Sequence, residues 1–131
     1  MNRVAVAALS MAVLLTACGG TDTSGPEPTG AARSGKELFS QRILGSNAGC
    51  ITCHSLDPDT RLVGPSIAGV AARAGSRVPG LRAEDYLRQS IVEPSAFVVD
   101  GFEDGKMPAD WEEMLSPEEV EALVAYLLTL Q

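Results

Sequence analysis

Aromatic residues are scarce in this chain of 131 residues: they make up only 5% of it, although 45% is hydrophobic. A chain of this length forms one domain, and a domain this small buries only roughly 60–70% of its unfolded surface. Domains near this limit usually gain stability from disulfides, a metal or a cofactor. The composition therefore favours a large bound group as part of the core.

Basic residues are also few, with 10 Lys and Arg against 17 Asp and Glu and a net charge of −7. Nucleic-acid binding needs clustered Lys and Arg to neutralise phosphates. The charge therefore predicts no nucleic-acid partner. It also leaves open the simpler interpretation that acidic side chains keep the protein in solution.

The apolar run Val4–Leu15 is too short to span a bilayer as a helix. It follows Arg3 and ends in Leu15-Thr16-Ala17-Cys18, which resembles the bacterial lipobox. The resemblance implies a lipoprotein signal peptide over 1–17, cleavage before Cys18, and a lipid on Cys18 that anchors the protein to a membrane. The alternative is an ordinary secretory signal that leaves Cys18 as a free thiol. The lipid anchor predicts a place in the bacterial cell envelope, with the folded domain on the periplasmic or extracytoplasmic side.

Residues 18–33 are rich in Gly, Thr, Ser and Pro and show no apolar periodicity. This composition is typical of a flexible tether. We therefore expect a lipidated tether over 18–33 and a single folded domain over 34–131.

Helix signals recur along the folded part. Ser34 and Glu37 have the spacing of a capping box and predict a helix over 35–44. Apolar periodicity predicts a second helix over 83–92 and allows a short helical piece within 66–74. A second capping box, Ser116 to Glu119, predicts the start of the last helix, whereas 95–115 reads as loop. No stretch alternates as a strand does, so we expect an all-α domain of three to five helices with long loops.

Cys50-Ile51-Thr52-Cys53-His54 is the attachment signature of haem c. Two thiols in one tight turn can form thioethers with the two vinyl groups of one haem, and the adjacent His54 becomes an axial ligand of the iron. A thioredoxin-type pair would need a βαβ pattern, and a zinc site would need four ligands. A simple disulfide would leave His54 without a role. The motif favours one haem c, bound covalently through Cys50 and Cys53.

The other axial ligand cannot be a second histidine, because His54 is the only one. Of Met107 and Met114, Met107 lies between Gly105 and Pro108, in a loop suited to a close and rigid approach, whereas plain packing suffices for Met114. The alternative for Met107 is a gap-filling role in the core. With His54 and Met107 as the metal ligands, the iron has no open position, which predicts an electron carrier and no enzyme.

These features together resemble class I (mono-haem) cytochromes c. The resemblance is carried by Gly35 and Phe39, the haem motif, Gly64-Pro65, Met107-Pro108 and the last helix with Tyr126. The stretches 64–69 and 86–91 resemble more particularly the cytochrome c domain fused to subunit II of caa3-type cytochrome c oxidases. The family implies the cytochrome c fold, with helices wrapped around one covalently bound haem, and a Pro65 carbonyl that accepts a hydrogen bond from His54.

Further residues are expected at the haem. Arg73 and Arg77 are candidates for pairing with the haem propionates, with two solvated surface arginines as the alternative. The expected pocket wall consists of Ile67, Phe97, Phe102, Trp111, Leu123 and Leu127.

The function expected is one-electron transfer in a respiratory or photosynthetic chain, either as a free carrier or as a subunit of a larger oxidoreductase complex. The redox partners expected are a quinol-oxidising complex or other donor, and a terminal oxidase, reaction centre or other acceptor. The alternative function is a haem-based sensor or ligand-binding protein whose Met107 can be displaced.

Overall fold

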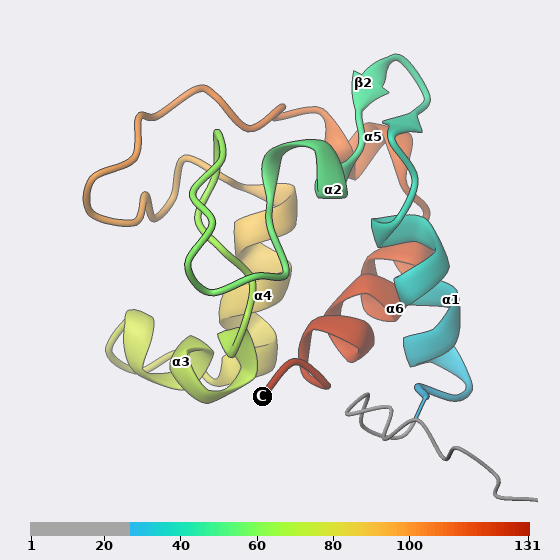
Figure 1. The fold of residues 1–131 in the computed structure, drawn as a ribbon, viewed down its shortest axis with the longest axis horizontal. Helices are drawn as coiled ribbons and strands as arrows, with labels where there is room; N and C mark the ends of the chain where they lie inside the picture. The colour runs from blue at the N-terminus through green and yellow to red at the C-terminus, as the bar shows by residue number, and fades with distance from the viewer. Residues whose placement is uncertain (1–26) are drawn as a thin grey trace, which may run out of the picture.

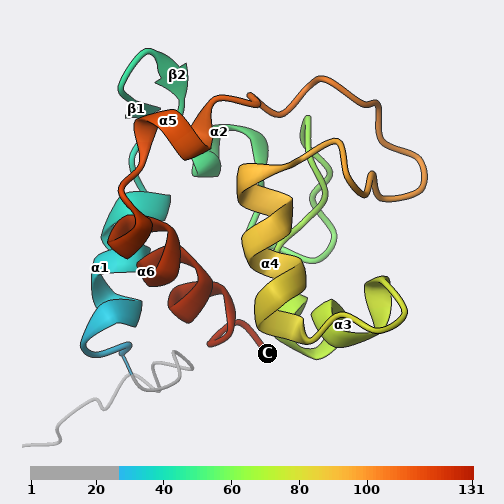
Figure 2. The same cartoon turned by 180° about the vertical axis from the view of Figure 1, so that it is seen from behind.

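The structure is a computed structural model that describes residues 27–131 (Figures 1 and 2). The predicted signal peptide, Cys18 and most of the predicted tether lie outside the described residues. The elements in chain order are α1 (Ala31–Phe39), β1 (Ile43–Leu44), β2 (Asn47–Ala48), α2 (Cys50–Cys53), α3 (Val70–Arg77), α4 (Ala83–Val92), α5 (Trp111–Met114) and α6 (Pro117–Leu127). None of these helices is long and apolar enough to cross a membrane.

The helical architecture that the sequence predicts is confirmed. The part of the chain that the structure describes contains six helices, where three to five were expected, and two of them, α2 and α5, are single turns of four residues. The turn α5 lies within 95–115, where only loop was expected. The two strands, which the sequence did not predict, form a minimal antiparallel hairpin that pairs Ile43 with Ala48 and Leu44 with Asn47. Strands of two residues are too short to produce a visible alternation.

The first helix was predicted at the wrong position. It begins at Ala31, three residues inside the range expected to form the tether, and ends at Phe39. Gly30 precedes it with a positive φ of 57°, and no side chain caps it, so Ser34 is not an N-cap. Glu37 instead pairs with Arg33 one turn earlier, at 3.3 Å. A Ser-x-x-Glu spacing also fits the middle of a helix, and two preceding alanines extend the helix backwards.

The α1 and α6 helices pack directly against each other and form one side of the core (Figure 1). Gly35 is the point of closest approach, because a Cβ there would lie 1.9 Å from the carbonyl oxygen of Ala122. The rings of Phe39 and Tyr126 then meet with centroids 5.5 Å apart. A small residue on α1 and aromatic residues on both helices thus define how the two ends of the domain join.

The predictions for α4 and α6 are confirmed. The helix α4 spans the expected 83–92. At the start of α6 the capping box is complete: the Ser116 hydroxyl accepts from the Glu119 amide, and the Ser116 amide donates to the Glu119 carboxylate at 2.8 Å. Leu115 and Val120, on either side of the cap, are both buried. Local signals are sufficient here because each contact lies within a few residues of the helix start.

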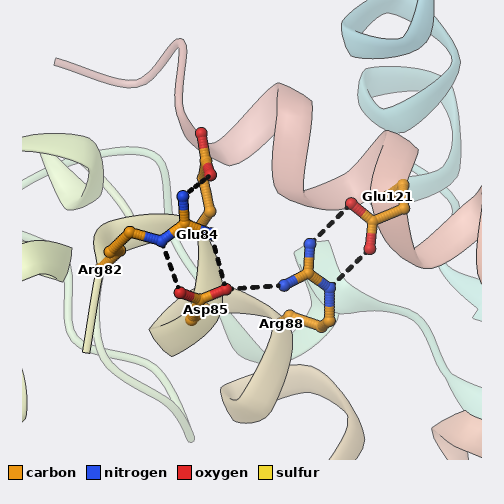
Figure 3. Close-up of polar contacts among 5 residues, drawn as sticks. All are labelled: Arg82, Glu84, Asp85, Arg88 and Glu121. Carbon is orange, nitrogen blue, oxygen red and sulfur yellow. Dashed lines mark hydrogen bonds and ion pairs between the residues drawn. The ribbon is translucent and has the colours of Figure 1, made fainter.

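An ion-pair network joins α4 to α6 on the surface (Figure 3). Arg88 of α4 reaches both carboxylate oxygens of Glu121 on α6, at 2.6 and 2.8 Å, and also contacts Asp85 at 3.2 Å. Arg82 binds Asp85 from the other side at 2.8 Å. The pKa of Glu121 is lowered, mainly by its hydrogen bonds from the Arg88 guanidinium.

Candidate functional site

The cysteines of the haem motif are placed by the turn before α2. The Gly49 amide and the Thr52 hydroxyl both donate to the carbonyl of Arg42, at 2.8 and 3.1 Å. Gly49 must be glycine at this crossing, because a Cβ would lie 1.9 Å from the Gln41 carbonyl oxygen. Cys50 and Cys53 follow one helical turn apart, partly buried and not joined to each other, and burial raises the pKa of the Cys50 thiol.

His54 follows directly after α2, and its ring orientation is set by one hydrogen bond. Nδ1 lies 2.8 Å from the carbonyl oxygen of Pro65. A carbonyl only accepts, so Nδ1 carries the hydrogen and Nε2 keeps its lone pair free to bind a metal. Burial lowers the pKa of His54, which favours the neutral imidazole that such bonding requires. The hydrogen bond implied by the family resemblance is thereby confirmed.

The loop that carries Pro65 is held on both sides. The Gly64 amide donates to the Cys53 carbonyl at 2.9 Å, and the Ile67 amide donates to the Ser55 carbonyl at 2.8 Å. Gly64 also lies directly against the imidazole, since a Cβ there would come within 2.4 Å of His54 Cε1. These backbone contacts hold the Pro65 carbonyl beside the His54 ring.

Met107 lies in the long loop of residues 93–110, which runs outward from the end of α4 and returns beside α2 (Figure 1). Asp104 stabilises a turn in this loop by accepting from the Ser95 hydroxyl at 2.6 Å and from the Gly105 amide at 2.7 Å, bonds that lower its pKa. Met107 is half-buried and packs against the core. Met114 also packs against the core, which is the packing role expected for it, and its sulfur accepts a hydrogen bond from Asn47 at 3.2 Å beside the hairpin.

One apolar cavity brings the predicted residues together. Its wall contains all of the residues predicted to hold the haem within the described part of the chain: Cys50, Cys53, His54, Pro65, Arg73, Arg77 and Met107. The six residues expected to form the pocket wall also line it: Ile67, Phe97, Phe102, Trp111, Leu123 and Leu127. Cys18 lies outside the described residues.

Arg73 does more than face the cavity. Its guanidinium donates to the carbonyl of Ala68 at 2.6 Å and to that of Ser66 at 3.1 Å, and so braces the turn beyond Pro65. A guanidinium has five N–H donors, so others remain for an anionic group in the cavity. Arg73 is half-buried, which disagrees with the alternative of a solvated surface arginine.

The residues fit a covalently attached haem. The cavity wall is mainly apolar, and it presents two thiols on one turn and an imidazole with a free nitrogen. Among residues 27–131 the one buried side-chain polar atom without a hydrogen-bond partner is Nε1 of Trp111, a residue of this wall. A buried N–H usually finds an acceptor, and a bound group with acceptor atoms can supply one. Haem combines a flat apolar body with peripheral carboxylates.

Two features of the site were missed from sequence. Tyr86, Ser90 and Ile91 line the cavity from α4. Their spacing on one side of the predicted helix was a signal that this side faces something apolar. Arg61 contacts the Met107 loop across 40 residues, and no local pattern could have found it.

Two thiols, an oriented imidazole and a thioether on the walls of one apolar cavity define a small haem-binding protein. The family model described as cytochrome c matches residues 32–131, and the chain therefore belongs to the cytochrome c family. Proteins of this family bind haem c covalently through a cysteine pair, here Cys50 and Cys53, and transfer electrons through it.

Solved structures similar to this chain include an engineered cytochrome c from Rhodothermus marinus (Rma TDE), with 23% identity over 76% of each chain and a TM-score of 0.48. Another is that engineered protein bound to a carbene intermediate, with 24% identity, the same coverage of 76% and a TM-score of 0.48. A comparison with curated protein sequences found no match.

Proposed function

We propose that this protein is a membrane-anchored electron carrier that transfers one electron at a time through a haem c ligated by His54 and Met107. The observation that carries the proposal is the hydrogen bond between His54 Nδ1 and the Pro65 carbonyl. It leaves Nε2 as the free nitrogen of a ring that lines the same cavity as Met107. If His54 and Met107 both held the iron, no coordination position would remain for a substrate, which favours a carrier over an enzyme.

A haem iron supplies a one-electron couple when bound, and the protein's residues determine how it is held. Cys50 and Cys53 would tie the group to α2 through two thioethers. The Pro65 carbonyl holds the His54 ring and raises the basicity of its ligating nitrogen. Met107 would supply a soft thioether to the iron, which would favour the reduced state and raise the potential. The apolar wall excludes water and favours a high potential further.

The proposed axial ligand is tested by replacing each methionine in turn. Met107→Ala should lower the reduction potential and allow carbon monoxide to bind the reduced haem. Met114→Ala is the matched control, because Met114 packs beside the hairpin and does not line the cavity. It should lose some stability and keep both the potential and the resistance to carbon monoxide.

Two outcomes would contradict this assignment. If Met107→Ala keeps the wild-type potential and stays closed to carbon monoxide, Met107 is not the ligand. If the wild-type protein itself binds carbon monoxide rapidly, the alternative of a haem sensor with a displaceable Met107 is favoured instead.

Anchoring is part of the proposal and depends on the sequence before the described residues. The run ending in Leu15-Thr16-Ala17-Cys18 supports cleavage before Cys18 and acylation of that residue. This would place the haem domain on the periplasmic or extracytoplasmic side of a bacterial membrane. Mass spectrometry of the mature N-terminus should find acylated Cys18, and an unmodified Cys18 thiol would refute the anchor.

The partners we propose are redox proteins of the same membrane. A quinol-oxidising complex or other donor would reduce the haem, and a terminal oxidase, reaction centre or other acceptor would oxidise it. The resemblance of residues 64–69 and 86–91 to the cytochrome c domain of caa3-type oxidase subunit II supports a place in such a chain.

A further inference from the structure

Two loops border the cavity, and one residue joins them. The loop after α2, residues 54–69, carries His54 and Pro65, and the loop of residues 93–110 carries Met107. Arg61 of the first loop places its guanidinium 4.2 Å above the ring centroid of Phe102 in the second. Its Nη2 also donates to the carbonyl of Gly101. The two contacts are made by the same planar group, which can stack and donate at once.

The rest of the Met107 loop is tied mainly to itself. Its side-chain bonds from Ser95 to Asp104 and from Lys106 to Glu103 both begin and end within 93–110. Its far end is held by Asn47, which donates to Asp110 at 2.7 Å. Among the hydrogen bonds of residues 27–131, the Arg61 bond to Gly101 is therefore the side-chain bond that joins the His54 loop to the Met107 loop.

We propose that Arg61 is a positioning residue that latches the Met107 loop in its closed position, and so sets how often Met107 leaves the iron. Phe102 lines the cavity and lies five residues before Met107, so a shift of Phe102 is transmitted to the ligand. Gly101 has φ 84°, a conformation open to glycine, which allows its carbonyl to meet Arg61. The inference rests on the proposed ligation by Met107.

The affinity of ferric haem for an external ligand reports how often Met107 is displaced, because such a ligand can bind only when Met107 has left the iron. The ligand's apparent dissociation constant is inversely proportional to the fraction of protein in which Met107 is displaced. Arg61→Gln should strengthen imidazole binding to the ferric protein by about tenfold, since a charge-assisted hydrogen bond and a cation–π contact are both lost. Arg61→Lys keeps the charge but lacks the fork and the flat face, so its effect should lie between. Arg33→Gln, which removes a remote exposed arginine on α1, is the control and should have no effect.

Two further variants separate this inference from the proposed function. Phe102→Leu should strengthen imidazole binding as well, by less than Arg61→Gln, because it removes only the cation–π contact. In the Arg61→Gln background it should have no further effect, because that contact is already lost. Met107→Ala should bind imidazole tightly on its own, and Arg61→Gln should then change the affinity by less than twofold.

Each failure has a distinct meaning. If Met107→Ala binds imidazole no better than the wild type, the ligand assignment fails, and the latch fails with it. If Met107→Ala binds tightly but Arg61→Gln, Arg61→Lys and Phe102→Leu all match the wild type, the latch alone is refuted. If Arg61→Gln still gives a tenfold gain in the Met107→Ala background, Arg61 controls access to the cavity and does not act through Met107.

Discussion

Gly35→Ala should lower the free energy of unfolding by disturbing the contact between α1 and α6. The added Cβ would lie 1.9 Å from the Ala122 carbonyl oxygen and 2.5 Å from its carbon. Both atoms belong to the backbone, so no side chain can rotate out of the way. The helices would have to separate locally by roughly 1.5 Å to restore the 3.4 Å of ordinary contact. That movement would also loosen the contact of Phe39 with Tyr126.

The expected magnitude follows from two opposing effects. Overpacking a close contact costs about 1–3 kcal/mol, and a clash with backbone belongs at the upper end of that range. Alanine offsets about 1 kcal/mol of this because it is the better helix former. We expect a net loss of about 2 kcal/mol in the free energy of unfolding. Gly75→Ala is the matched control, since the nearest atom to its Cβ is 3.7 Å away. It should gain about 0.5–1 kcal/mol.

Guanidinium unfolding of the haem-loaded proteins, followed by far-UV circular dichroism, measures both changes. The slopes should match the wild type, so that the midpoints report stability alone. A Gly35→Ala protein as stable as the wild type would refute the close approach of α1 and α6. So would equal shifts in the two variants, because helix propensity would then explain both.

Two further predictions concern the His54 ring and the surface network. Gly64→Ala would place a Cβ 2.4 Å from His54 Cε1, so it should displace the imidazole ring. The haem absorbance per mole of purified protein should then be lower than in the wild type. Full haem loading with an unchanged reduction potential would contradict this. Glu121→Gln should cost up to about 1 kcal/mol near pH 7, because Glu121 and Arg88 are 53% and 38% exposed and solvent screens the pair. The pKa of Glu121 is lowered on folding from 4.5, so its contribution is present above that pH and is lost as the pH falls through the folded-state pKa. The stability difference between wild type and Glu121→Gln should therefore shrink in acid, and a difference that is constant from pH 7 down to pH 3 would refute it.

Local patterns predicted those parts of the fold whose contacts lie close together in the sequence. The capping box at Ser116 and the apolar spacing over 83–92 both occur as predicted, because a helix start and an apolar stripe depend on neighbouring residues. The same logic failed at Ser34, where the pattern is also compatible with a helix interior. The structure begins α1 at Ala31, after Gly30 has turned the chain with a positive φ. The short pairing of β1 with β2 left no periodic signal to read.

The sequence alone predicted the chemistry of the site, because that chemistry depends on the spacing of a few residues along the chain. Two cysteines with two residues between them, followed directly by the chain's only histidine, indicate that a haem can be attached there and that an imidazole nitrogen can bind its iron. Folding decided the rest, since cavities and long-range contacts are made by segments that meet only in three dimensions. Met107 shares a cavity with His54, Trp111 Nε1 is buried beside it, and Arg61 crosses 40 residues to Gly101. No local sequence pattern predicts these three features, because each depends on how several loops and helices pack together.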